Sequence, residues 1–102
     1  MVESEFILLG TERDESGVPW ALLATEHEGR LAFAGPAIFN PPRADRPTWV
    51  GRMAELALTK PPVSGLKRKA AQWLRPELRV RVRHLNAKGT LRHASVKQFI
   101  TN

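Results

Sequence analysis

Three arginines alternate with apolar residues in one short segment of this 102-residue sequence. Arg79, Arg81 and Arg83 lie at every second position of the segment 78–83, and the intervening positions are Leu or Val. A period of two predicts a β-strand with the arginines on one face, about 7 Å apart. Guanidinium groups at this spacing can each bind the oxygens of successive phosphates. The segment therefore predicts a phosphate-binding surface, called the arginine stripe below.

A solvated strand face is the alternative interpretation of the arginine stripe, because like charges on a strand also protect it from edge-to-edge aggregation. No facing acidic strand is evident in the sequence, so we favour phosphate binding over mutual repulsion. Arg92 and Lys97 lie on the expected next strand and would extend the basic surface. Lys67, Arg68 and Lys69 would reach it from a preceding loop.

The charge of the chain is divided unevenly along its length. The net charge is +6. Residues 1–30 hold seven acidic and two basic residues, a net charge of −5, whereas residues 31–102 hold three acidic and fourteen basic residues, a net charge of +11. A cationic body of this kind predicts a polyanionic partner, in the first place nucleic acid. The acidic first 30 residues would either screen that body or dock on a protein partner.

Several kinds of chemistry are excluded by composition. There is no cysteine, so disulfides and thiolate metal sites are excluded and a reducing, cytoplasmic location is expected. His27, His84 and His93 lack the spacing of metal ligands and no carboxylate cluster accompanies them, so no metal site is predicted. No Gly-rich phosphate loop is present, and no catalytic residue is predicted. We find no signal peptide and no apolar run long enough to span a bilayer, so no membrane partner is expected.

The pattern of apolar residues and turn residues predicts a single, mainly β domain over residues 1–102. Strands are expected at Phe6–Leu9, Trp20–Thr25 and Leu31–Ala34, with turns at Arg13–Gly17 and His27–Arg30, and Gly35-Pro36 would bend or break the third strand. Two further strands are expected at 78–85 and Thr90–Val96, joined by a turn at Asn86–Gly89.

One helix is expected between the third and fourth strands. Asp45 would cap it, Pro47 would lie in its first turn, and Lys60-Pro61-Pro62 would end it. Its predicted apolar face is Trp49, Val50, Met53, Leu56 and Ala57. This order of elements fits a five-stranded OB-fold Greek-key barrel, although an α+β sandwich has the same order.

Trp20, Trp49 and Trp73 could stack on exposed bases, but their positions favour a role in the core. Trp20 begins a predicted buried strand and Trp49 lies on the apolar helix face. His84 follows the core-facing positions of its strand, so we expect it to be packed at one end of the barrel.

Two segments resemble the C-terminal OB-fold domain of ATP-dependent DNA ligases, especially the bacterial end-joining and repair type. They are Trp73-Leu74-Arg75-Pro76-Glu77-Leu78 and Gly89-Thr90-Leu91-Arg92-His93-Ala94-Ser95. Glu5–Gly10 and Leu31–Gly35 also look like the family's first and third OB strands. The resemblance covers nearly the whole chain, although Ala94 replaces the family's usual proline.

The resemblance implies a module that grips the duplex backbone at a nick during DNA repair, recombination or end joining, in the bacterial nucleoid. It adds Arg75 and His93 to the predicted contacts. The full set predicted to bind DNA is Lys67, Arg68, Lys69, Arg75, Arg79, Arg81, Arg83, Arg92, His93 and Lys97.

The resemblance also implies that the chemistry is supplied elsewhere. The family's Lys-x-Asp-Gly nucleophile and its closing Arg-x-Asp-Lys motif are not found here, where the sequence ends Lys97-Gln98-Phe99-Ile100-Thr101-Asn102. ATP and Mg²⁺ would be bound by the complete ligase, and a nucleotidyltransferase domain is expected as partner in cis or in trans. The isolated chain is expected to be an inactive monomer, either part of a longer ligase or a stand-alone relic.

Two other functions fit the same sequence. One is a stand-alone OB module that binds single-stranded DNA or RNA. The other is a docking domain for a ligase or repair partner.

Overall fold

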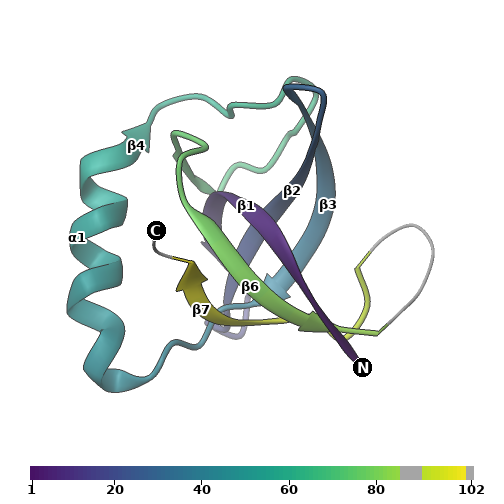
Figure 1. Cartoon of the computed structure of the whole chain (residues 1–102). Coiled ribbons are helices and arrows are strands. Elements are labelled where there is room, and N and C mark those ends of the chain that lie inside the picture. The colour runs from purple at the N-terminus through teal and green to yellow at the C-terminus, as the bar shows by residue number, and fades with distance from the viewer. Residues whose placement is uncertain (86–90, 101–102) are drawn as a thin grey trace.

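The computed structural model describes residues 1–85 and 91–100. The described chain is mainly β and has one α-helix, as the sequence predicts (Figure 1). Its elements are β1 (Val2–Arg13), β2 (Pro19–His27), β3 (Arg30–Ile38), the 3-10 helix η1 (Arg43–Asp45), α1 (Arg46–Leu56), β4 (Ala57–Leu58), β5 (Gln72–Leu74), β6 (Arg79–His84) and β7 (Ser95–Ile100).

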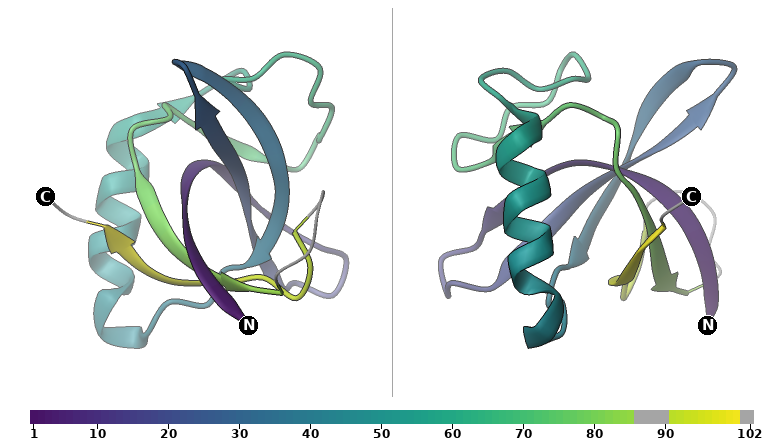
Figure 2. Two further views of the ribbon diagram at one scale, coloured as in Figure 1. Left: turned by 45° about the vertical axis from the view of Figure 1, so that its right-hand side comes forward. Right: turned by 60° about the vertical axis from the view of Figure 1, so that its left-hand side comes forward.

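Five strands of one sheet form a closed ring. β2, β3, β7, β6 and β1 are neighbours in that order, and β1 also pairs with β2, which closes the circuit. All pairings in the ring are antiparallel except β3 with β7, where Ile38 pairs with Ser95 in parallel. Figure 2 shows the long strands curving around a common centre, with α1 at one side. The helix connects the third and fourth strands of the ring, as the sequence predicts.

β1 closes the ring because it pairs with different strands along its length. Residues 2–7 pair with β6, and residues 7–13 pair with β2. The register with β2 shifts between Leu8 and Gly10, so Leu9 is an extra residue in a β-bulge. A bulge bends and twists its strand, which lets one strand serve both partners. The side chains of Leu8 and Leu9 point to opposite faces of the sheet and lie in two different hydrophobic clusters.

The larger hydrophobic cluster, called the inner cluster below, lies inside the ring. Leu8, Leu23, Val80 and Val82 are fully buried there. Helix α1 adds Trp49, whose ring packs edge-on against Phe39 and stacks on Phe99 of β7. Burying apolar side chains from every ring strand and from α1 is the main source of stability of the fold.

The outer cluster lies on the other side of β1, β2 and β3. Its buried residues are Leu9, Leu22, Ala24 and Trp73. The loop 59–71 between β4 and β5, called the covering loop below, packs Val63, Leu66 and Ala71 against them together with Leu58 of β4. The sheet is therefore covered by apolar residues on both faces in this region.

The helix differs from its prediction at both ends and on its face. It ends at Leu56, and Ala57 and Leu58 pair with β5 as a short strand before the Lys-Pro-Pro sequence begins. Val50 is 63% exposed and Ala57 is exposed, so the buried face consists of Trp49 and Leu56 with Met53 half-buried. Asp45 occupies the N-cap position, but its backbone is already helical (φ −90°, ψ −13°) and its side chain makes no capping bond. A capping side chain normally requires an extended backbone at that residue.

The last strand also differs from its prediction. β7 runs from Ser95 to Ile100 rather than from Thr90 to Val96. His93 has a φ of +50°, which no strand residue adopts, and it turns the chain just before β7. The predicted turn at 86–89 lies outside the described residues.

The other predicted turns are confirmed. β1 and β2 are joined at 14–18, and β2 and β3 at Glu28-Gly29, where both residues have positive φ. The first three strands are longer than predicted at both ends. The third strand continues through Gly35-Pro36 to Ile38, with a register shift that leaves Ala34 as the extra residue.

Gly10 of β1 lies very close to the backbone of β5, and a substitution there would test this close approach. A Cβ at this position would lie 2.5 Å from the carbonyl oxygen of Gln72 and 3.1 Å from the Trp73 ring. We expect Gly10→Ala to lower the free energy of unfolding by about 1–3 kcal/mol, because backbone atoms would have to move. Urea denaturation would measure the change.

Gly51→Ala is the matched control. Gly51 lies inside α1, and nothing lies within 4 Å of the position of an added Cβ. Alanine should stabilise the helix there by about 0.5–1 kcal/mol. Equal effects of the two substitutions would contradict the close approach at Gly10.

Candidate nucleic-acid interface

The arginine stripe lies on β6, between β1 and β7. Leu78, Val80 and Val82 are buried, as predicted, while Arg79 and Arg83 are exposed and Arg81 is half-buried. The three arginines thus face outward from the ring on one side of the strand.

The acidic strand that the sequence did not make evident is β1. In the pairing of β1 with β6, Glu3 is opposite Arg83 and Glu5 is opposite Arg81. Directly opposed residues of an antiparallel pair share a face, with their Cβ atoms about 5 Å apart. The arginines of the stripe therefore have acidic neighbours on β1, contrary to the prediction from the sequence.

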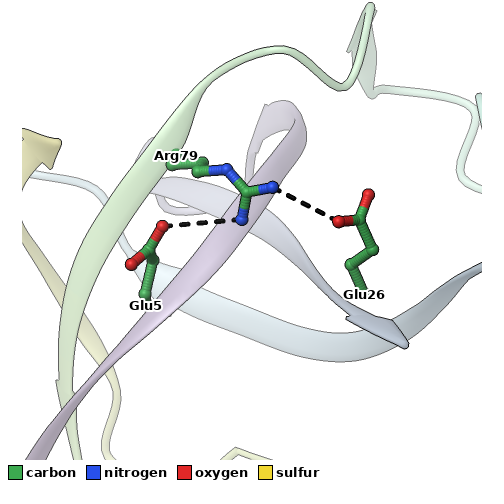
Figure 3. Close-up of polar contacts among 3 residues, drawn as sticks. All are labelled: Glu5, Glu26 and Arg79. Atoms are coloured by element: carbon green, nitrogen blue, oxygen red, sulfur yellow. Dashed lines mark hydrogen bonds and ion pairs between the residues drawn. The ribbon is translucent and has the colours of Figure 1, made fainter. Parts of the chain in front are cut away.

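Arg79 makes two ion pairs that join three strands (Figure 3). Its Nη1 donates to Oε1 of Glu5 on β1 at 3.5 Å, and its Nη2 donates to Oε1 of Glu26 on β2 at 3.3 Å. In the described part of the chain, no ion pair joins Arg81 or Arg83 to a carboxylate. The three arginines of one stripe therefore differ in how strongly they are engaged.

Lys97 lies beside the arginine stripe, at a bulge in β7. Val96 pairs with Val82 and Gln98 pairs with Arg81, so Lys97 is the extra residue on β7 and it is exposed. Arg92 is brought to the end of the stripe, where its carbonyl accepts a hydrogen bond from the Leu85 amide. His93 is exposed and follows directly. The structure thus gathers Arg81, Arg83, Arg92 and Lys97 around one end of β6.

The predicted loop cations lie elsewhere. Arg68 forms an ion pair with Glu12, near the opposite end of β1 from Glu3, and its guanidinium lies 5.4 Å from the centre of the Phe33 ring. Both partners of the pair are largely buried, with side chains 33% and 17% exposed. Arg68 therefore fastens the covering loop to the sheet. Lys67 and Lys69 flank it and are exposed.

Arg75 is also separate from the stripe. Its Nε lies 3.2 Å from a carboxylate oxygen of Glu77, and its amide donates to the carbonyl of Leu56, the last residue of α1. Arg75 thus links the segment between β5 and β6 to the C-terminal end of α1.

The tryptophans are mainly structural. Trp49 and Trp73 are 3% and 6% exposed, so neither can stack on a base. Trp20 is half-buried, and its indole N–H donates to Oδ2 of Asp14 at 3.0 Å.

The histidines have no shared site. His84 is half-buried as expected: its ring packs edge-on against Phe6 and contacts Ser4 Oγ and the Leu85 carbonyl. His27 is exposed at the end of β2. Among residues 1–85 and 91–100, no three His, Asp or Glu side chains gather as metal ligands, and no helix is long and apolar enough to cross a membrane.

Glu3, Glu5 and Glu26 are the site residues that sequence reasoning missed. The apolar pattern predicted a first strand that began at Phe6, and the family resemblance extended it only to Glu5. Their spacing of two was a signal, since it continues the alternation of the strand toward the N-terminus. Glu26 carried no such signal, because its approach to Arg79 depends on the curvature of the ring.

The fold of this chain is similar to folds in solved structures of other proteins. No protein-family model matches the chain, and no curated protein matches it. Solved structures do match. The ligase domain of LigD from M. tuberculosis has a TM-score of 0.74 and 20% sequence identity over 97% of this chain. A mycobacterial DNA ligase D complexed with ATP and MES has a TM-score of 0.71 and 22% identity over 97% of this chain.

These similarities show a fold shared with part of a DNA ligase. The chain spans about a third of those structures, 35% and 34% of their lengths.

The role of Arg68 gives a test of stability. We expect Arg68→Ala to lower the free energy of unfolding by about 1–2 kcal/mol, because it leaves Glu12 partly buried without its partner and removes the contact with Phe33. Lys67→Ala removes the same charge from an exposed neighbour and should change stability by less than about 0.5 kcal/mol. Urea denaturation of both variants would decide, and equal losses would contradict the fastening role.

Asp14 gives a test of pH dependence. Hydrogen bonds from Trp20 and from the amides of Val18, Ser16 and Gly17 lower the pKa of Asp14 below its ordinary value of 3.8. Its ionised form therefore stabilises the fold above pH 3.8, and this contribution is lost as the pH falls through the lowered pKa. Asp14→Asn should be less stable than the wild type at pH 6, and the difference should shrink by pH 3. Denaturation midpoints at the two pH values would measure it, and a constant difference would contradict this role.

Proposed function

We propose that this chain is the OB-fold, DNA-binding module of an ATP-dependent DNA ligase, which grips the backbone of a nicked duplex in repair or end joining. The similarity of the fold over 97% of the chain to the ligase domain of LigD carries this proposal. The sequence motifs around Trp73 and Arg92 support it independently.

The topology supports the OB assignment. An OB-fold is a five-stranded, partly open Greek-key barrel. Here the ring of five strands closes through β1, α1 follows the third strand, and β3 meets β7 in only one parallel residue pair. The short pairing between β3 and β7 is consistent with a barrel that is partly open between these two strands.

The DNA contacts are proposed at the end of β6. Arg81, Arg83, Arg92 and Lys97 would bind phosphate oxygens, while Arg79 is engaged by carboxylates in the free protein. Contacts of this kind fix a duplex by its shape and charge rather than by its base sequence. The other predicted contacts contribute less in this proposal, because they lie away from the stripe or make other contacts. They are Arg75, Lys67, Arg68, Lys69 and His93.

A duplex is favoured over a single strand because the surface offers few stacking platforms. Proteins that bind single strands place bases on exposed aromatic rings. In the described residues, two of the three tryptophans are buried, and Phe33 on β3 is half-buried and faces Arg68.

The chemistry of ligation would be supplied by a nucleotidyltransferase domain in cis or in trans, which would bind ATP and Mg²⁺. We propose no catalytic residue in this chain, and we propose that it works as a monomer in the bacterial nucleoid.

Docking on a protein partner is the second candidate, and one observation favours it. A groove of about 630 Å³ runs along α1, and Val50, Met53, Phe39, Pro41 and Pro19 are among its lining residues. A docking domain that uses this groove would have no need to bind DNA.

Salt-dependent DNA binding tests the proposal. The affinity for a fluorescent nicked duplex should fall steeply with salt, and single-stranded DNA should compete weakly. Arg81→Ala/Arg83→Ala should reduce the slope of log K against log salt by about 2, since each lost phosphate contact contributes about 0.9. Anisotropy titrations at several salt concentrations would measure it.

Arg52→Ala/Lys60→Ala is the matched control. It removes the same charge from α1 and from the covering loop. An equal loss of slope in both double variants would assign binding to net charge and not to the stripe. A wild type that does not bind the nicked duplex would rule out the proposed function and leave docking.

A further inference from the structure

Carboxylates lie beside the arginine stripe in the free protein, and they pair with one of its arginines. Three arginines on β6 lie beside three carboxylates: Glu3 and Glu5 oppose Arg83 and Arg81, and Glu26 reaches Arg79 from β2. The net charge of +6 is therefore not concentrated at the stripe. A polyanion that approached this face would meet three carboxylates beside the three arginines, while Arg92 and Lys97 add positive charge at one end.

Arg79 is the most strongly compensated of the three. Glu5 and Glu26 hold its two terminal nitrogens from opposite sides, as Figure 3 shows, so two negative charges surround one positive charge. The fold itself makes this arrangement. Ile7 of β1 pairs with both Arg79 of β6 and Ala24 of β2, which places the three strands side by side at this level.

The ion pairs of Arg79 are suited to exchange. Their lengths of 3.3 and 3.5 Å exceed those of strong charge-assisted hydrogen bonds. The side chains of Arg79, Glu5 and Glu26 are 45%, 46% and 42% exposed, so water and salt reach all of them. Exposed pairs of this kind contribute little net stability. A phosphate could replace the carboxylates without unfolding any element.

We propose that Glu5 and Glu26 compete with DNA phosphate for Arg79 and thereby limit the affinity of the domain for DNA. This inference rests on the proposed function and assigns these two residues a role in regulating it. A phosphate that takes Arg79 leaves two carboxylates without their partner and close to DNA. Only a DNA that makes enough other contacts, at Arg81, Arg83 and Lys97, would complete the exchange.

The exchange has a signature in the salt dependence. Binding of a phosphate by a cation normally releases counterions from DNA. Here the freed carboxylates would take up cations, which offsets that release. Removing the carboxylates should therefore both strengthen binding and steepen its salt dependence.

The test compares the full chain with Glu5→Gln/Glu26→Gln. We expect this variant to bind a nicked duplex roughly three- to tenfold more tightly near 0.1 M salt, with a slope of log K against log salt steeper by about 1. Glu15→Gln/Glu28→Gln is the matched control: it makes the same charge change in the same acidic segment at exposed carboxylates, for which no ion pair with an arginine is found in the described residues. Its affinity should rise less and its slope should not change.

Arg79→Ala, made in both backgrounds, assigns the effect to one side chain. It should weaken wild-type binding, because Glu5 and Glu26 then lie without their partner close to the DNA, and it should remove the steeper slope of Glu5→Gln/Glu26→Gln, which is a coupling that independent sites would not show. Urea denaturation of each variant would verify that the fold is retained.

The possible results separate the two proposals. An equal gain in the control, or a steeper slope that persists without Arg79, would overturn the competition. Weaker binding by Glu5→Gln/Glu26→Gln would also overturn it, since the carboxylates would then hold Arg79 in place for DNA. If no form of the chain binds the nicked duplex, the proposed function fails and the competition fails with it.

Discussion

The pairing of β1 with two different strands is the constraint on which the rest of the structure depends. Its first half belongs to β6 and its second half to β2, and the bulge at Leu9 makes the transition possible. Because of this division the sheet closes into a ring, whose inner side packs against α1 and whose outer side packs against the covering loop. The same division determines the charges at the surface, since it places Glu3 and Glu5 beside the arginine stripe.

Much of the architecture could be predicted from the sequence because it follows from local patterns. The alternation at 78–83 gave β6 and its buried face, and glycine and proline marked most turns. The predictions were wrong where contacts between distant parts of the chain determine the backbone conformation. Asp45 has the right residue type for a cap, yet its backbone is set by the preceding 3-10 helix. The start of β7 depends on the unusual backbone of His93, which residue type alone does not reveal.

The candidate site was harder to predict than the fold because its chemistry depends on neighbours that are distant in sequence. The outward position of Arg79, Arg81 and Arg83 follows from their period. Whether each guanidinium is compensated depends on the register of β1 and on the curvature that brings Glu26 to Arg79. Arg68 illustrates the same limit: it lies in a basic triplet between two lysines, but alone among them it is fixed by Glu12 and Phe33.

The alternation of side chains along β1 has a consequence for how the chain reaches this fold. Leu8 and Leu9 lie in hydrophobic clusters on opposite sides of one sheet, so a slip of β1 by one residue would still place a leucine on each side. The same slip would turn Glu5 toward the core and Phe6 toward water, because a shift by one residue moves every side chain to the other face. This penalty allows a single alignment of the strand. The buried side chains thus fix the register of β1, and this register places Glu5 and Glu26 close to Arg79, although their ion pairs are too weak to direct folding.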